Sequence, residues 1–157
     1  LLRNEKKNKS ELGLKISSIM NAGELVSDNI VSELIEKFVS NNKYKNKIIF
    51  DGYPRNLEQA KNLDKMLRLH GQKIDVVLKL SVTLATVKKR ILERHNQEKR
   101  EDDNEEIAIK RYKTYENSSL PVLDYYKGFN LLKVVNGEST ISEINTEISD
   151  LIDALKG

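Results

Sequence analysis

The chain has 157 residues, of which 38% are hydrophobic, and this length is typical of one domain. Its 27 basic and 24 acidic residues are interspersed, so the net charge of +3 does not indicate a nucleic-acid-binding protein. No run approaches the roughly 18 apolar residues of a membrane-spanning helix. The absence of cysteine excludes disulfides and thiolate metal sites and fits the reducing cytoplasm, where we expect the protein. With only two histidines, a histidine-built zinc site is not expected.

The first part of the chain is expected to be mainly helical. Residues 10–21 predict a short helix, and Ser27 is a good N-cap for the next one. That helix has an apolar stripe at helical spacing, which consists of Ile30, Val31, Leu34, Ile35 and Phe38. Residues 47–51 then predict a short buried strand, and residues 57–69 predict a helix that ends near a glycine.

The second part alternates strands with helices. Residues 74–80 and 131–135 predict two strands. Between them we expect a helix from Thr83, a polar loop over residues 95–102 and a long helix that ends near Lys127.

The start of the last helix is predicted by Thr140-Ile141-Ser142-Glu143, which has the sequence of a capping box. Strands that alternate with helices favour an α/β fold with a parallel sheet. Three strands are few for such a sheet, so the sequence predicts that part of the domain is absent from it.

The most informative segment joins the first predicted strand to the helix over residues 57–69. Asp51 places a carboxylate at the carboxyl end of the strand, where open α/β sheets bind ligands. Gly52 allows the backbone to approach a ligand closely. Arg55 offers a guanidinium for a phosphate, and Gln59 offers one donor and one acceptor for a base edge.

The arginines stand out because 20 of the 27 basic residues are lysines. Where lysine is the usual surface cation, an arginine suggests planar, bidentate phosphate recognition. Four arginines follow one another in the second half of the chain: Arg90, Arg94, Arg100 and Arg111. The first two share a helix face, and Asp102 and Asp103 favour the positive end of the helix that carries the last. The four are placed to stabilise charge during phosphoryl transfer.

Together these motifs resemble the adenylate kinase family in its short-lid form. The resemblance rests on the segment from Asp51 to Gln59, on the arginine series with Arg100-Glu101-Asp102-Asp103, and on residues 10–13 and 19–28, which are similar to the nucleoside-monophosphate-binding region. It implies a P-loop nucleoside monophosphate kinase fold, with a parallel sheet flanked by helices. The implied activity is reversible phosphoryl transfer from ATP-Mg to AMP, giving two ADP, by a monomer that binds neither nucleic acid nor membrane.

The resemblance also implies roles for individual residues. Those expected to bind AMP are Arg3, Glu24, Leu25, Val26, Gly52, Tyr53, Pro54, Arg55, Gln59, Arg100 and Arg111. The catalytic residues implied are Arg94, Arg100 and Arg111, and the ATP-binding residues are Arg90, Arg94 and Ser139. The implied cofactor is Mg²⁺ with ATP, and Asp51 would act on it through water. The Tyr53–Pro54 peptide bond is expected to be cis.

The expected organisation is one kinase domain over residues 1–157, incomplete at its N-terminus. Residues 1–40 would form most of the AMP-binding helical region, residues 95–102 a short lid, and the remainder the core. The phosphate-cradling motif G-x-x-x-x-G-K-[ST] does not occur, because none of the seven glycines precedes a lysine. We expect a missing segment of roughly 30 residues that supplies this loop and a central first strand. A true truncation is the other explanation.

Two other functions remain open at the level of sequence. A kinase of the same fold that acts on UMP or CMP is the first, although Gln59 favours adenine because the resemblance implies asparagine in those relatives. A non-catalytic AMP-binding module is the second, if the phosphate loop is truly absent.

Overall fold

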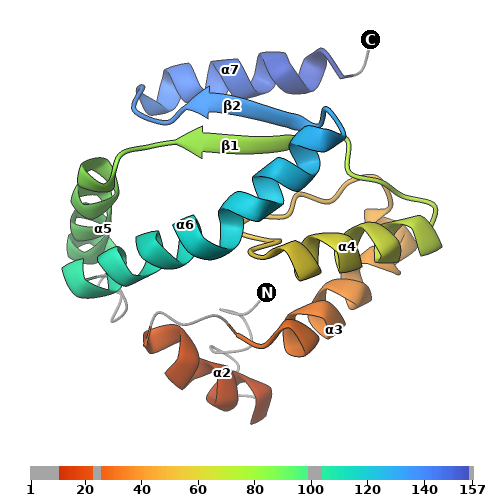
Figure 1. Ribbon diagram of the computed structural model, residues 1–157, viewed down its shortest axis with the longest axis horizontal. Coiled ribbons are helices and arrows are strands. Elements are labelled where there is room, and N and C mark those ends of the chain that lie inside the picture. Colours follow the sequence, from red (N-terminus) through yellow and green to blue (C-terminus); the bar gives the residue numbers. More distant parts are fainter. Residues whose placement is uncertain (1–10, 23–25, 99–103, 156–157) are drawn as a thin grey trace.

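The computed structural model describes residues 11–22, 26–98 and 104–155, and Figure 1 shows its helices around two strands. In chain order the elements are α2 (Glu11–Asn21), α3 (Asp28–Val39), the 3-10 helix η1 (Asn42–Tyr44), α4 (Leu57–Leu69), β1 (Val77–Ser81), α5 (Leu84–Glu98), α6 (Glu105–Gly128), β2 (Leu132–Asn136) and α7 (Ile141–Asp153).

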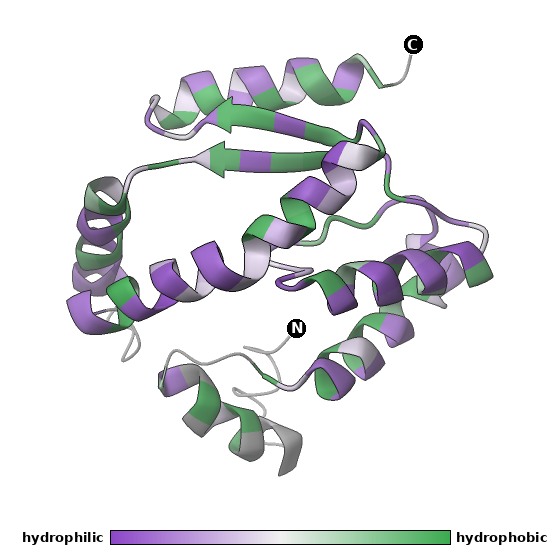
Figure 2. Ribbon diagram, viewed as in Figure 1, coloured by the Kyte–Doolittle hydropathy of each residue, from purple (hydrophilic) through white to green (hydrophobic). Residues whose placement is uncertain are grey.

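The two strands form a small parallel sheet. Val77 pairs with Leu132, and the register continues to Ser81 and Asn136. Parallel neighbours require a long crossover, and α5 and α6 supply it. Helix α7 lies along β2 (Figure 1), and both strands are largely hydrophobic (Figure 2). These features confirm the predicted α/β class with a parallel sheet flanked by helices.

The prediction of a strand over residues 47–51 was wrong. The side chains of this segment nevertheless alternate between a packed and an exposed face, as they would in a strand. Ile48 and Phe50 pack against the core, whereas Ile49 is 89% exposed. Assignment as a strand also requires a hydrogen-bonded neighbour, and no ladder to this segment occurs within the described residues. The pattern therefore predicted the faces of the segment but could not supply a partner for its backbone.

Several other boundaries differ from the prediction by one to four residues. Strand β1 begins at Val77 because its pairing with β2 begins there, and β2 is displaced by one residue from the predicted range. Helix α5 continues to Glu98, so residues 95–98 are helical and not the start of a loop. This turn contains neither glycine nor proline, and its last two residues, Gln97 and Glu98, are good helix formers, which is consistent with the extension.

Two hydrophobic clusters bind the helices together. In the first, Ile35 and Val39 of α3 pack against Leu63 and Leu67 of α4. In the second, α4 meets α6 at Ala60, Val122 and Tyr126. Helix α4 belongs to both clusters, so α3, α4 and α6 are held as one unit.

Side-chain caps fix the beginnings of several helices, among them α4, α6 and α7. The side chains of Asn56 and Asn104 accept hydrogen bonds at the starts of α4 and α6. The predicted capping box of α7 is confirmed, with both reciprocal bonds between Thr140 and Glu143. Ser27 occupies the N-cap position of α3 as expected, but its side chain makes no capping bond. The cap of α4 matters most here, because it fixes the turn that carries Arg55.

Candidate active site

The turn before α4 is built tightly around one glycine. Gly52 has φ of +68°, a conformation that favours glycine. Its carbonyl accepts a bond of 2.6 Å from Nε of Arg55, so the guanidinium lies folded over the turn. The peptide bond between Tyr53 and Pro54 is cis, as predicted. Asp51 is exposed beside this turn.

Gln59 is 2% exposed and lies at the centre of a partly buried polar network. Its Oε1 accepts from the backbone N–H of Arg55 at 2.8 Å, and its Nε2 donates to Oδ1 of Asp28 at 2.6 Å. Asn56 donates from Nδ2 to Oδ2 of the same aspartate at 2.9 Å. Both ends of the Gln59 amide, which is predicted to bind the base, thus form hydrogen bonds with other groups of the protein.

Two other predicted AMP-binding residues lie close to the protein interior. Val26 is 6% exposed, and Tyr53 is half-buried against the cluster of α3 and α4. Burial raises the pKa of the Tyr53 hydroxyl, and the negative charge of Asp28 adds to the rise. Both residues therefore contribute packing as well as any contact with a ligand.

The turn after β2 is joined closely to α5. The carbonyl of Gly137 accepts a bond of 2.7 Å from Arg90, and its N–H donates to the carbonyl of Ser81 at 2.9 Å. A Cβ at Gly137 would lie 2.5 Å from Cγ1 of Val82. The predicted ATP-binding residue Arg90 is thus a link between α5 and this turn, where Ser139 is half-buried.

Glu138 of the same turn caps α5 from outside the helix. Its Oε1 accepts from the N–H of Thr83 at 2.6 Å, and its Oε2 accepts from the hydroxyl of Thr86 at 2.5 Å. These bonds, that of Thr86 first, lower the pKa of the Glu138 carboxyl. The position of the helix that carries Arg90 and Arg94 is therefore set partly by the loop after β2.

Helix α6 connects the elements that carry the predicted arginines. It packs against both α4 and α5 (Figure 1). Ser119 of α6 donates to the carbonyl of Arg55 at 3.0 Å, and Glu105 at its start pairs with Lys88 of α5 at 2.9 Å. Arg111 of α6 and Arg94 of α5 are both half-buried. The turn that carries Arg55 and helix α5, which carries Arg94, are thus both held against α6, which itself carries Arg111.

Several predicted residues lie outside the described residues: Arg3, Glu24, Leu25, Arg100, Asp102 and Asp103. Their roles stay predictions, and so does the role of the lid over residues 95–102, of which residues 99–102 lie outside the described residues. The described residues contain no group of three or more histidine, aspartate or glutamate side chains that could hold a metal.

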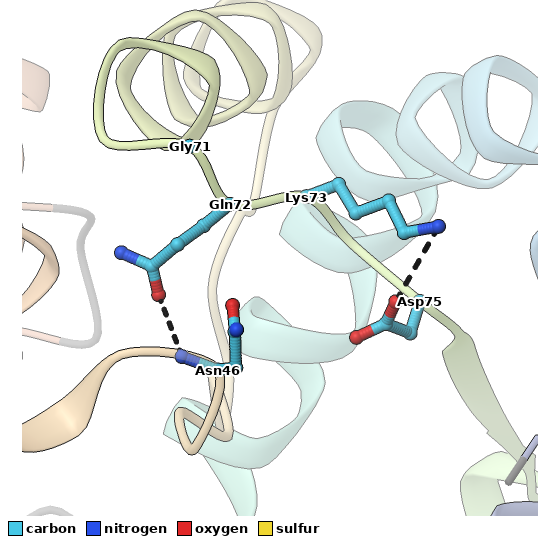
Figure 3. Close-up of a pocket in the computed structure, with 5 residues that line it drawn as sticks. All are labelled: Asn46, Gly71, Gln72, Lys73 and Asp75. Carbon is cyan, nitrogen blue, oxygen red and sulfur yellow. Dashed lines mark hydrogen bonds and ion pairs between the residues drawn. The ribbon is translucent and has the colours of Figure 1, made fainter.

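Figure 3 shows the residues that line a surface cavity of about 460 Å³. It is lined by Asn46, Gly71, Gln72, Lys73 and Asp75. Gln72 accepts from the N–H of Asn46 and donates to the carbonyl of Val39, each at 2.9 Å. These bonds tie the loops at the ends of α3 and α4, and no predicted site residue lines the cavity.

Comparison with known proteins identifies the family. A sequence model described as adenylate kinase matches residues 1–131. An adenylate kinase of Pelagibacter ubique is 36% identical, over 97% of this chain and 84% of the relative. The chain belongs to the adenylate kinase family. Adenylate kinases of Caulobacter vibrioides and Phenylobacterium zucineum are 39% and 42% identical, over 92% and 88% of this chain and 75% and 73% of the relatives.

Family membership confirms the resemblance inferred from the sequence, including the nucleoside monophosphate kinase fold. Adenylate kinases are transferases that move a phosphoryl group between ATP and AMP. Among the described residues, no helix is long and apolar enough to cross a membrane.

Spacing in the sequence gave no signal for two residues of the site. Asp28 is 31 residues from Gln59, and Glu138 is 55 residues from Thr83. Only the packing of α3 on α4, and of the turn after β2 on α5, brings these pairs together. Asp28 accepts a bond from Gln59, and Glu138 accepts a bond at the start of the helix that carries Arg90 and Arg94. The sequence analysis had identified Gln59 and these two arginines as site residues.

Proposed function

We propose that this protein, in a molecule that carries a phosphate-cradling loop, transfers a phosphoryl group from ATP-Mg to AMP and gives two ADP. The observation that carries the proposal is the position of α6, which joins the turn at Arg55 to α5 and itself carries Arg111. Phosphoryl transfer needs positioned phosphates and positive charge more than covalent chemistry. The motif for the loop is not among these 157 residues.

On the acceptor side, Arg55 would grip the phosphate of AMP together with Arg3. The amide of Gln59 would pair with the adenine edge. Val26 and the turn at Gly52 would contact the nucleoside, together with Glu24, Leu25, Tyr53 and Pro54. The bond that holds the guanidinium over the turn supports this arrangement, because a positioned guanidinium suits the oxygens of a phosphate.

On the donor side, Arg94 and Arg111 would stabilise charge on the transferring group together with Arg100. Arg90, which bonds the carbonyl of Gly137, would hold the turn after β2, with Ser139, beside the adenine of ATP. The lid over residues 95–102 would cover the phosphates and exclude water.

Magnesium would bind with ATP, and its contact with this chain would be indirect. Mg²⁺ keeps several waters and usually takes one or two carboxylates with substrate phosphates. The exposed carboxylate of Asp51 fits that role. We further propose a cytoplasmic monomer, with residues 1–40 forming most of the AMP region.

The proposal is tested by comparing AMP, CMP and UMP as acceptors, with ATP-Mg as donor and the full-length protein as catalyst. We expect kcat/KM to be highest for AMP. Faster phosphorylation of CMP or UMP would instead assign the protein to pyrimidine nucleotides.

A further inference from the structure

The carboxylate of Asp28 receives two amide groups, one on each oxygen. Gln59 donates to Oδ1 at 2.6 Å, and Asn56 donates to Oδ2 at 2.9 Å. An ionised carboxylate can only accept hydrogen bonds. Both amides must therefore turn their NH₂ groups toward α3, which carries this aspartate.

The oxygen of the Gln59 amide is also fixed by its hydrogen-bond partner. Its Oε1 faces the backbone N–H of Arg55, which can only donate. A flipped amide would set donor against donor there and acceptor against acceptor at Asp28. Asn56 cannot rotate to relieve this, because its Oδ1 accepts the capping bond from the N–H of Gln59 at 2.8 Å.

The fixed amide has a consequence for base recognition, if Gln59 reads the base as proposed above. It makes two hydrogen bonds within the described residues, and a carboxamide can make four, so one N–H and one lone pair remain. Adenine offers a 6-amino donor beside the N1 acceptor. A 6-oxo purine offers the reverse order, an acceptor at O6 beside an N1–H donor.

We propose that Asp28 is a positioning residue that fixes the amide of Gln59 and thereby makes the acceptor site select AMP over 6-oxo purine monophosphates. The inference rests on the proposed function, because it concerns the same acceptor site. The burial of Gln59 supports the fixed orientation of its amide. Because the side chain is only 2% exposed, water could not readily replace the bonds to Arg55 and Asp28, so a flipped amide would be costly.

The test is the variant Asp28→Asn, which keeps the shape but replaces one acceptor by a donor. One of the two amides then meets a donor, and the orientation of Gln59 is no longer unique. Calorimetry on the full-length protein would measure Kd for AMP, for IMP as the 6-oxo probe, and for ATP. Asp75→Asn is the matched control, because Asp75 is exposed and pairs only loosely with Lys73 at 4.0 Å.

We expect wild type and Asp75→Asn to prefer AMP over IMP. We expect Asp28→Asn to lose about 10- to 100-fold of that preference, the usual worth of a bidentate base contact. Kd for ATP should not change. The ratio of affinities does not depend on the fraction of protein that is folded, so reduced stability of the variant would not obscure it.

An unchanged ratio in Asp28→Asn would overturn the inference, and so would a wild type that binds AMP no better than IMP. Failure of the proposed function is a separate result. It would appear as a wild type that binds AMP selectively but does not phosphorylate it in the presence of ATP-Mg.

Discussion

Arg55 is held in place by hydrogen bonds to several parts of the fold. Its Nε is held by the carbonyl of Gly52, its N–H by Gln59 and its carbonyl by Ser119 of α6. The residue is therefore fixed by three different elements of the fold. This degree of fixation is more than an ordinary surface arginine requires.

We predict that Arg55→Ala weakens AMP binding by about 10- to 100-fold, as expected for a lost bond to a charged group. Binding of ATP should change by less than a factor of about two. Calorimetric titration with each nucleotide measures this, and Arg68→Ala, an exposed arginine near the end of α4, is the control. Equal losses for both nucleotides would refute the assignment.

Gly137 is restricted by space and not by its backbone angles. A Cβ there would lie 2.5 Å from Cγ1 of Val82 and 2.9 Å from the carbonyl oxygen of Ser81. We predict that Gly137→Ala lowers the free energy of unfolding by about 1–3 kcal/mol, because backbone must move. Urea denaturation should show no such loss for Gly128→Ala, where a Cβ would meet nothing within 4 Å.

At the scale of elements, α4 is the helix that holds the acceptor region to the rest of the protein. Leu63 has no exposed surface and lies between its neighbours in the cluster with α3. We predict that Leu63→Ala lowers the free energy of unfolding by about 2–5 kcal/mol. In the same helix, Leu69 is 76% exposed, so Leu69→Ala should cost less than about 0.5 kcal/mol. Similar losses in both variants would contradict this packing.

Helix α5 depends on a carboxylate from another element. Hydrogen bonds from Thr86 and Thr83 lower the pKa of Glu138 from its usual value of 4.5. A lowered pKa means that the stabilisation is present above about pH 4.5 and is lost as pH falls through the folded value. We predict that wild type exceeds Glu138→Gln in stability at pH 6 and that the difference shrinks at pH 4 and below.

Urea denaturation at each pH measures the stability of Glu138→Gln, and Glu147→Gln on the exposed face of α7 is its control. A stability difference that stays constant from pH 6 to pH 4 would show that the charge of Glu138 does not cap the helix.

Helices whose ends are determined by nearby residues could be predicted from the sequence. A strand could not be predicted in the same way, because it also needs a hydrogen-bonded neighbour from a distant part of the chain. Helix α4 was predicted to the residue because an asparagine cap precedes it and a glycine turn follows it. The capping box of α7 is equally local. The segment over residues 47–51 has the right alternation, yet whether it is a strand depends on a neighbour that no local pattern encodes.

The same division applies to the site. Gly52, Arg55 and Gln59 could be grouped from the sequence because one short segment, the turn and the first turn of α4, carries all three. It could not show that Gln59 is buried against Asp28, because that contact depends on how α3 crosses α4. Motif spacing therefore identified the chemical groups of the site, and packing determined how they are held.

In the molecule as a whole, α6 connects the acceptor turn to α5. Residues from three elements would act on one polyphosphate, so loss of any catalytic arginine should impair turnover more than folding. We expect Arg94→Ala and Arg111→Ala to lower kcat by on the order of 100-fold or more, as for other charge-stabilising groups.

The most direct measurement is the initial rate of ADP formation from ATP-Mg and AMP by the full-length protein and by these two variants. We predict that wild type forms ADP and that both variants form it at least 100-fold more slowly. Variants that match the wild-type rate, or a wild type that forms no ADP, would contradict it.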